Sequence, residues 1–343
     1  MSDSHDVAVV GAGVIGLSIA WRARQAGLSV VLIDRDEPGR GTSHRAAGML
    51  APVSEADPAE RPLLELLMRS AASWPAFAAE LEVPLRTEGT LFVARDSDGA
   101  AAIDREIEIR DKLGLRVERL LPSAARALEP ALAPTVRLAA SLPGDHSVEP
   151  REVVCALIAA CEGCGVEFLR AEVDPGALRS HRVVVATGAW SPAPVRPVKG
   201  QALLLRDKDG PGLVSRILRF EGGYLVPRGT DRYYLGATVE EQGYDTTPTA
   251  LGVYELLRDC AEVLPAILEL EIDELVCGLR PGTPDNAPII GPDPGSERIV
   301  WATGHYRHGI VLAPVTAELV VAELTGAPQD HGFGPRRFER VAA

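Results

Sequence analysis

The stretch 6-DVAVVGAGVIGLSIAWRARQAGLSVVLID-34 decides the fold of this chain. Its apolar run at residues 7–10 is too short for a helix and ends at a glycine, so it predicts a buried β-strand. Residues 14–25 predict a helix that Gly27 ends, and residues 29–33 predict a second buried strand. Strand, glycine turn, helix and strand in this order predict the first unit of a Rossmann-like α/β fold.

The turn inside this unit carries three glycines, Gly11, Gly13 and Gly16, which fit the pattern G-x-G-x-x-G. The first glycine allows the tight turn, the second lets the backbone approach a pyrophosphate, and the third lets the helix pack closely on the strand. The helix N-terminus would face the phosphates. Asp34, at the end of the second strand, would accept ribose hydroxyls. A glycine turn in another α/β protein is the plainer alternative, but the four features together favour a dinucleotide site.

Composition narrows the class of protein. A chain of 343 residues is long enough for two joined domains, and 46% hydrophobic with 24% charged residues is ordinary for a globular enzyme. The net charge of −13 argues against a nucleic-acid partner or an anionic membrane surface. No apolar run approaches the ~20 residues of a membrane span, and the acidic start does not resemble a signal peptide. We therefore expect neither nucleic acid nor membrane as a partner.

The cysteines indicate the compartment. There are five: Cys155, Cys161, Cys164, Cys260 and Cys277. An odd count in a chain of this size favours reduced thiols and a cytoplasmic location. Cys161 and Cys164 form a C-x-x-C, but no second pair lies nearby, so a zinc or redox site is the weaker interpretation and no metal is expected.

The rest of the chain predicts a second, antiparallel part and a return to the first. Residues 63–81 have helical periodicity with a kink or restart at Pro75. The middle of the chain, rich in Tyr, Leu and Val, is typical of an antiparallel sheet. A strand at 298–302, a glycine-bounded turn and a helix at 310–324 then return to the first part. A strand at 182–186 ends at Thr187 and Gly188, which fit a second close approach to the ligand.

In this order the segments resemble the D-amino-acid oxidase family of flavoproteins, and most closely its bacterial glycine oxidases. The resemblance covers roughly residues 7–324 and is carried by VVGAGVIG with Asp34, TSHRAAGMLAP, VEPREVV, VVVATGAWS, PVKGQ, GYLVPR, LGATVE, GLRPGTPDNAPIIG and TGHYRHGIVLAP. Unrelated folds would not reproduce these segments in register. One departure is the region between Val173 and Arg182, which is shorter than the family usually has and calls a peripheral hairpin into question.

The resemblance implies a fold that is α/β, or α+β overall, with a Rossmann-like FAD-binding domain and an interleaved antiparallel-sheet substrate domain. The implied FAD-binding domain comprises residues 1–80, 145–195 and 277–330. The substrate-binding domain comprises 81–144 and 196–276, and 331–343 form a C-terminal tail. FAD is expected to bind noncovalently, because no cysteine lies in a recognisable attachment motif.

Residues for FAD follow from the glycine pattern and from the resemblance together. The pattern gives Gly11, Gly13, Gly16, Asp34, Thr187 and Gly188. The resemblance implies further FAD contacts at Val14, Ile15, Arg35, Thr42, Ser43, Ala47, Gly48, Met49, Val173, His305, Tyr306, Arg307, His308, Gly309, Ile310 and Val311. A helix beginning at Ile310 would place positive potential at the pyrimidine edge of the flavin, where reduction adds negative charge.

The resemblance also implies the residues that bind the substrate. Arg280 would hold the substrate carboxylate through a bidentate pair, Arg307 would be a second cation beside the carboxylate and flavin, and Tyr224 would donate its hydroxyl. These three are the predicted catalytic residues, and Met49 and Val239 would complete the substrate site. The alternatives are a structural salt bridge for each arginine and a half-buried sheet position for the tyrosine.

The implied reaction depends on positioning more than on acid–base catalysis. An amine bound in its neutral form can release hydride from its α-carbon to the flavin, so no strong side-chain base is required. We therefore assign His44, His305 and His308 packing or backbone roles. Arg280 and Tyr224 would aim the carbon–hydrogen bond at the ring.

The expected function is FAD-dependent oxidative deamination of glycine and small D-amino acids to 2-oxo acids, ammonia and hydrogen peroxide, with oxygen as the second substrate. A role in thiazole biosynthesis for thiamine rests on analogy alone. The alternatives are an oxidase or dehydrogenase of sarcosine, proline or another secondary amine, and a flavin-binding protein without turnover. A nicotinamide dehydrogenase is weaker, because the segment TGHYRHG would then lack a purpose. Whether the protein is a homo-oligomer is left open.

Overall fold

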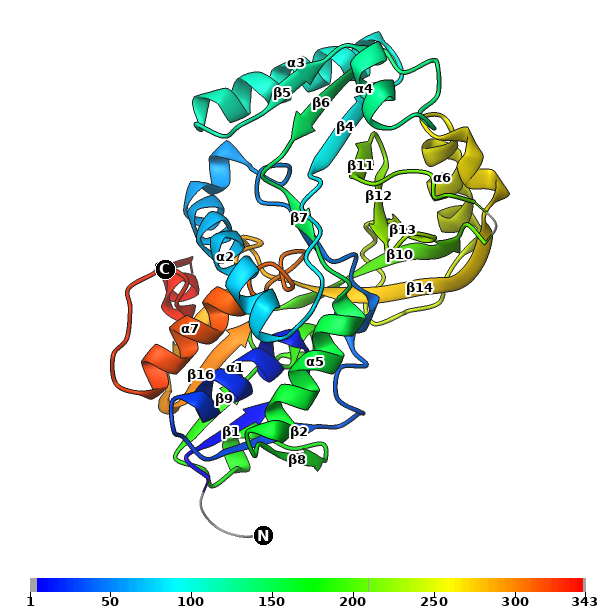
Figure 1. The fold of residues 1–343 in the computed structure, drawn as a ribbon. Helices are drawn as coiled ribbons and strands as arrows, with labels where there is room; N and C mark the ends of the chain where they lie inside the picture. Colours follow the sequence, from blue (N-terminus) through cyan, green and yellow to red (C-terminus); the bar gives the residue numbers. More distant parts are fainter. Residues whose placement is uncertain (1–4, 209, 342–343) are drawn as a thin grey trace.

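A computed structural model describes residues 5–208 and 210–341 and contains two large sheets (Figure 1). The first sheet consists, in spatial order, of β15 (Ile289–Asp293), β16 (Ser296–Thr303), β9 (Arg182–Val185), β1 (Val7–Val10), β2 (Val30–Asp34) and β8 (Glu167–Arg170). Its strands from β16 to β8 are parallel, and β15 runs antiparallel at the edge. This is the Rossmann-like sheet that the glycine motif predicts.

The second sheet has eight strands and is almost entirely antiparallel. In spatial order it consists of β14 (Glu271–Gly282), β10 (Arg196–Arg206), β13 (Arg232–Gly236), β12 (Gly223–Arg228), β11 (Ile217–Phe220), β4 (Thr90–Ala94), β6 (Leu138–Leu142) and β5 (Glu118–Leu120). Only the β11–β4 pair is parallel. A short ribbon of β3 (Met49–Leu50) and β7 (His146–Ser147) completes the pairing. The predicted combination of a Rossmann-like part and an interleaved antiparallel part is confirmed.

Helices cover the sheets in separate groups, which Figure 1 places at the lower and upper ends of the molecule. The first sheet carries α1 (Val14–Gln25), α5 (Pro150–Gly163) and α7 (Ala313–Leu324), and α2 (Arg61–Glu80) packs on α7. The second sheet carries α3 (Ser97–Lys112), α4 (Pro122–Leu128) and α6 (Ala250–Ala261). Single 3-10 turns occur at η1 (Thr42–Arg45), η2 (Pro58–Glu60), η3 (Pro175–Ala177), η4 (Gly188–Trp190), η5 (Pro265–Glu269) and η6 (Pro335–Val341).

The unbroken apolar run of β1 has a direct cause in the packing. Val7 and Val9 belong to the core beneath the helices, whereas Ala8 and Val10 belong to the core on the opposite face of the sheet. Successive side chains of a strand point to opposite faces, so a strand buried on both faces must be apolar at every position. The opposite face is covered by irregular chain that includes Val173, not by a second layer of helices.

Several sequence-based expectations need correction in detail. The last helix begins at Ala313 and not at Ile310, because Pro314 lacks the N–H that a helix interior requires and so lies in the first turn. α2 runs without a restart through Pro75, which lies on its exposed face. The short region between Val173 and Arg182 needs no such correction: it forms only the 3-10 turn η3, so the hairpin that its length called into question is absent there.

The chain crosses repeatedly between the two sheets, and we propose the domain division given above on this basis. Strand β14 runs across the proposed boundary at residue 277, and it pairs with β10 on both sides of that boundary. The proposed tail packs against the first sheet, where Phe333 is buried and its carbonyl accepts from the Ile290 amide at 3.0 Å. Residues 1–4, 209, 342 and 343 of these ranges lie outside the described residues.

Two features predicted from composition can be compared with the fold. Among the described residues, no helix is both long and apolar enough to cross a membrane. All five cysteines are free. The Cys161 thiol is buried beneath α1, where its Sγ lies 3.4 Å from the Leu17 carbonyl oxygen, so it serves as a packing residue.

We expect Trp74→Phe to lower the free energy of unfolding by about 1–3 kcal/mol, because it removes a buried hydrogen bond and part of a packed ring. Trp74 is fully buried, and its Nε1 donates to the Val311 carbonyl at 2.9 Å, which fixes the turn before α7. Urea unfolding of this variant and of Tyr254→Phe, which alters an exposed ring, provides the test. Equal midpoints for Trp74→Phe and the wild type would contradict this role.

Candidate active site

A cavity of about 1050 Å³ joins the two sheets. It begins at the carboxyl ends of β1, β2 and β9, where Val10, Ile33 and Ala186 line it, and it ends at Tyr224 and Arg280 of the second sheet. Its size reaches the upper end of the range of about 300–1,000 Å³ for ligand sites. All the predicted FAD and substrate residues except Gly16 line this one cavity. Their individual roles stay predictions.

Gly16 does not line the cavity because it has a packing role in the glycine turn. Gly11 has φ of +107°, and a Cβ there would lie 2.4 Å from the Ala186 carbonyl oxygen. A Cβ on Gly16 would lie 1.8 Å from the carbonyl oxygen of Gly11. Gly16 therefore lets α1 pack on the turn, whereas Gly13 meets only the Ser43 Oγ at 3.2 Å and leaves its backbone open to a ligand.

Asp34 is fixed at the end of β2 by backbone donors. Its Oδ2 accepts from the Ala12 amide at 2.6 Å, and its Oδ1 accepts from the Asp36 amide at 2.9 Å. A carboxylate has about four acceptor positions, so two remain for ribose hydroxyls. Beside it, the Arg35 guanidinium lies 4.5 Å from the centre of the Trp190 ring. This end of the cavity suits an adenosine group.

Backbone amides without protein acceptors line the cavity at two places. Among the described residues, the amides of Gly13 and Ile15 donate to no protein acceptor, and neither do those of Gly309, Ile310 and Val311. The first pair suits phosphate oxygens. The second group lies in the turn before α7, so turn amides, and not the helix end predicted at Ile310, would face the flavin.

Other parts of the cavity wall also fit FAD. The buried Thr187 hydroxyl lines the cavity and has no partner among the described residues. The loop before β3 is held close, because the Ser43 Oγ accepts from the Val14 amide at 3.0 Å and a Cβ on Gly48 would lie 2.0 Å from the Val148 carbonyl oxygen. The backbone thus approaches the cavity where a flat ring would lie.

Arg280 lies at the opposite end of the cavity and is held by carbonyl groups. Its Nη1 donates to the Thr238 oxygen at 3.0 Å and to the Lys199 oxygen at 3.3 Å. A Cβ on Gly200 would lie 2.6 Å from this guanidinium, so Gly200 allows the side chain to cross β10. Among the described residues Arg280 has no carboxylate partner. Its Nη2 and Nε make no hydrogen bond to a carboxylate or carbonyl group of the described residues, and the Tyr224 side chain lies close enough to interact with the guanidinium.

Tyr224 lies beside Arg280 and is braced by a second tyrosine. The Tyr224 and Tyr234 rings stack with centroids 6.3 Å apart, and the Tyr234 hydroxyl donates to the Arg45 carbonyl at 2.9 Å. Burial raises the pKa of Tyr224, and the neighbouring Arg280 opposes that rise only in part. Tyr224 is therefore a neutral hydroxyl donor facing the same space as the guanidinium.

Glu55 and Arg219 also belong to this end of the cavity, and the sequence alone did not indicate them. Arg219 pairs with Tyr224 across β11 and β12, so the two side chains share one face of the sheet. Glu55 accepts from Arg219 Nη1 at 2.6 Å and from Arg307 Nη1 at 3.2 Å. Burial favours the neutral acid, but the two arginines outweigh it and lower the pKa of Glu55 to about 2. Glu55 is thus ionised and neutralises part of both charges.

The backbone around Glu55 is held from both sides. The buried Asp145 carboxylate accepts from the Val53 amide at 2.9 Å and from the Ser54 amide at 3.2 Å. Arg110 donates to the carbonyl oxygens of the same two residues at 2.9 and 2.8 Å. These contacts fix the position of Glu55 in a segment that belongs to no helix or strand.

The histidines of the cavity are poor bases. Burial lowers the pKa of His305 to about 3 and that of His308 to about 4, so both are neutral near pH 7. His305 Nε2 lies 3.0 Å from the Thr316 hydroxyl, with which it shares a hydrogen bond. Burial also lowers the pKa of His44. This agrees with packing or backbone roles for all three.

A Rossmann-like unit whose cavity runs from a glycine turn to an arginine on a second sheet is the architecture of a dinucleotide-dependent oxidoreductase. The chain matches the family of FAD dependent oxidoreductases, DAO, over residues 6–323 and belongs to that family. Its cofactor is FAD.

Relatives with this architecture cover nearly all of the chain. A glycine oxidase from Geobacillus kaustophilus is 31% identical over 94% of this chain and 93% of its own length. A crystal structure of a glycine oxidase from the same species matches with a TM-score of 0.90 at 30% identity, covering 98% of each chain. A bifunctional protein ThiO/ThiG from Synechocystis is 32% identical over 98% of this chain, which spans only 55% of that protein's length.

Removal of the Asp34 carboxylate should weaken FAD binding by about 1.5–3 kcal/mol, because charge-assisted hydrogen bonds to the ribose would be lost. Titration of apoprotein with FAD, followed by flavin fluorescence, measures this for Asp34→Ala. Asp111→Ala removes an exposed carboxylate on α3 and is the control. Turnover at saturating FAD should survive, and an unchanged FAD dissociation constant would refute the assignment.

Proposed function

We propose that this protein catalyses the oxidative deamination of glycine and small D-amino acids to 2-oxo acids, ammonia and hydrogen peroxide, with FAD as cofactor. The observation that carries the proposal is the position of Arg280, which lines the cavity beside the Tyr224 hydroxyl and has no carboxylate partner in the part of the chain that the structure describes. The similarity to glycine oxidases over almost the full chain supports it.

Arg280 is the better candidate for binding the substrate carboxylate. Arg307 already donates to Glu55 and is half-exposed, whereas the Nη2 and Nε of Arg280 donate to no carboxylate or carbonyl group of the described residues. Two parallel N–H donors match the two oxygens of a carboxylate, which fixes orientation as well as position. Tyr224 would donate a further hydrogen bond to the same carboxylate.

The two buried histidines of the site do not oppose the reaction of the amine, because both are neutral. FAD, when bound, accepts a hydride from the substrate carbon and passes two electrons to oxygen, which gives hydrogen peroxide. The amine must be in its neutral form so that its lone pair stabilises the carbon that loses hydride. His305 and His308, with their low pKa values, place no positive charge beside it. Hydrolysis of the resulting imine with one water gives the oxo acid and ammonia.

The space for a side chain is bordered by Gly222 and Val239, which both line the cavity. Gly222 has φ of +92°, and a Cβ there would lie 2.4 Å from an Asp259 carboxylate oxygen. The turn therefore requires glycine at this position, and Gly222 borders the cavity with its backbone alone. Val239 is 66% exposed and contributes an apolar wall. We propose that an apolar D-side chain fits here.

The proposal has three further parts. FAD would bind noncovalently, because none of the five cysteines lines the cavity. A cytoplasmic location is supported by five free thiols. A role in thiazole biosynthesis for thiamine follows only from the resemblance to relatives of that kind.

A peroxide-coupled assay at one oxygen concentration tests the proposed function. It compares glycine, D-alanine, D-valine, L-alanine and sarcosine as substrates of the FAD-loaded protein. Turnover of sarcosine alone would favour a secondary-amine oxidase, and flavin reduction without peroxide would favour a dehydrogenase. A flavin that stays oxidised with every amine would leave a binding protein without turnover.

We expect kcat/KM for D-alanine to be at least as high as for glycine. An apolar pocket stabilises each added methylene by about 0.8 kcal/mol, or roughly fourfold. L-Alanine should not react, because a carboxylate held by Arg280 would turn its α-hydrogen away from the flavin. The initial rates of the same assay measure all of these. A clear preference for glycine would show that another group fills the space beside Val239.

Arg280→Leu should lower kcat/KM for glycine, which corresponds to a loss of about 3–5 kcal/mol of transition-state stabilisation. The substrate carboxylate would then enter a pocket without its partner. Steady-state kinetics at saturating FAD measure this, and FAD should still bind. Arg307→Leu should lower kcat/KM less, because Glu55 still holds Arg219 as a second cation in the site. Arg206→Leu, on an exposed part of β10, is the control. Near-wild-type efficiency of Arg280→Leu would mean that the two arginines have been assigned wrongly.

A further inference from the structure

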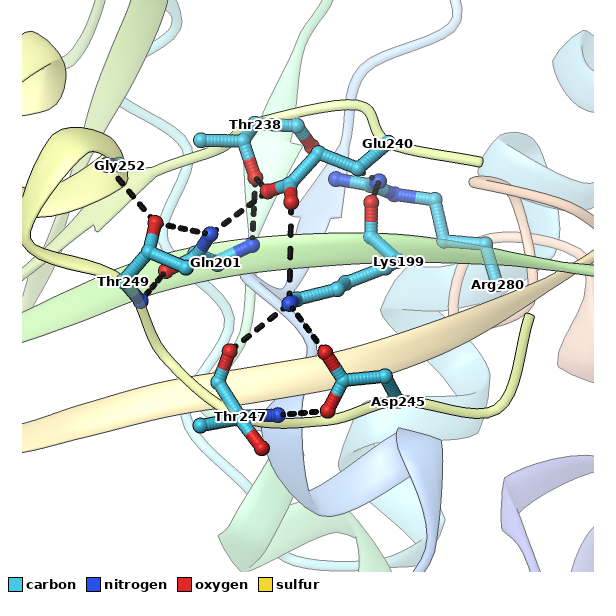
Figure 2. Close-up of polar contacts among 9 residues, drawn as sticks. All are labelled: Lys199, Gln201, Thr238, Glu240, Asp245, Thr247, Thr249, Gly252 and Arg280. Carbon is cyan, nitrogen blue, oxygen red and sulfur yellow. Dashed lines mark hydrogen bonds and ion pairs between the residues drawn. The ribbon is translucent and has the colours of Figure 1, made fainter. Parts of the chain in front are cut away.

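Lys199 buries a charged ammonium group outside the cavity, and the proposed reaction does not use it. The side chain is 1% exposed. Its Nζ donates to the Thr247 carbonyl at 2.8 Å and lies 3.3 Å from an Asp245 oxygen and 3.7 Å from a Glu240 oxygen (Figure 2). Burying a charge costs free energy, and the three partners offset that cost only in part. A buried lysine at this position therefore suggests a role that an apolar side chain could not fill.

All three partners lie on one segment, residues 237–249, which connects β13 to α6 and which we name the strap. The strap has no helix or strand of its own, and its residues from 241 onward are exposed. A segment with so little apolar burial depends on polar contacts for its order. Lys199 joins the first part of the strap, at Glu240, to its second part, at Asp245 and Thr247.

Gln201 holds the ends of the strap to the same strand, β10. Its Nε2 donates to Glu240 Oε1 at 2.7 Å and to Thr249 Oγ1 at 3.1 Å, and its Oε1 accepts from the Thr249 amide at 2.6 Å (Figure 2). Thr249 Oγ1 in turn accepts from the Gly252 amide at 3.2 Å at the start of α6. Thus Lys199 and Gln201, two residues apart on β10, fasten the strap along its length.

Two parts of the strap border the cavity. Ala237 and Val239 line the substrate end, and Tyr244 and Thr246 line it farther along. The Tyr244 hydroxyl donates to the Ala189 carbonyl at 3.1 Å, and its ring stacks on Trp190 at 6.2 Å. Trp190 is also the ring that Arg35 covers. The strap therefore reaches from the proposed substrate pocket to the adenosine end.

The strap also holds Arg280. The carbonyl oxygens of Thr238 and Lys199 both accept from Arg280 Nη1. The backbones of Lys199 and Glu240 pair in both directions, at 2.9 and 3.0 Å. Thr238 lies two residues before Glu240, and its amide donates to the Gln201 carbonyl at 3.2 Å, so the strap is held to β10 on both sides of Val239. Any shift of the strap moves one of the two acceptors that orient the guanidinium.

We propose that Lys199 is a positioning residue, whose ammonium fastens the strap so that Arg280 is oriented to bind a carboxylate. The inference rests on the proposed function only in taking a carboxylate as the ligand of Arg280. A purely structural role would lower stability without a specific effect on carboxylate binding. The two roles therefore separate in a binding measurement.

The test measures acetate binding to FAD-loaded protein by the change in flavin absorbance, together with kcat/KM for glycine. Acetate carries the carboxylate of glycine but has no amine to oxidise. Lys199→Met should weaken acetate binding at least tenfold, or about 1.4 kcal/mol, and Asp245→Asn about threefold. Lys208→Met removes an exposed lysine paired with Glu271 and should leave both quantities unchanged.

A double-mutant cycle identifies the route of the effect. If Lys199 acts through Arg280, Lys199→Met should add little to the loss caused by Arg280→Lys, whereas independent effects would add. Acetate binding by Lys199→Met within twofold of wild type, or additive losses, would overturn the proposal.

If Lys199→Met does not hold FAD, the Asp245→Asn variant provides the test. Weaker acetate binding by Asp245→Asn at an unchanged melting temperature supports the role of Lys199, and wild-type acetate binding overturns it. Wild-type protein that binds acetate but oxidises no amine would refute the proposed function and leave this inference standing.

Discussion

The constraint on which the site depends is the crowding of three backbones at the glycine turn. The Ala186 carbonyl closes on Gly11, and the Gly11 carbonyl closes on Gly16, so β9, β1 and α1 meet where any Cβ would collide. This contact aligns the ends of the parallel strands and leaves the amides of Gly13 and Ile15 free to face a ligand. The cavity exists because the strands can end so close together without side chains between them.

The interleaved chain then supplies the other end of the cavity. Arg280, Arg219 and Arg307 come from β14, from β11 and from the turn before α7, and no two of them are close in sequence. Glu55 pairs with two of the three and leaves Arg280 as the cation without a carboxylate partner among the described residues. The electrostatic asymmetry of the site is therefore a product of the tertiary fold and not of any single motif.

This division explains what the sequence could predict. The strand at 7–10 and the helix at 14–25 follow from local periodicity and appear with the same bounds. The motif residues could be assigned to one cavity from the sequence, because their segments resemble a known family. Glu55 carried no local signal, since its arginine partners lie 164 and 252 residues away. Apolar periodicity also overextended the last helix to Ile310, because it ignores where a proline can lie.

Arg280 is oriented by neutral carbonyl groups and not by a counterion. A guanidinium paired with a carboxylate would have to exchange that partner for the substrate, and part of the binding free energy would be lost in the exchange. Carbonyl acceptors orient Arg280 through Nη1 without neutralising it, so its charge and its remaining donors are ready before a ligand arrives. That arrangement requires both carbonyls to stay in place, although one lies on an exposed strap. The cost of burying Lys199 beneath that strap is understandable in these terms, because the ammonium adds side-chain contacts at Glu240, Asp245 and Thr247 to the hydrogen bonds by which Gln201 of β10 holds Thr238.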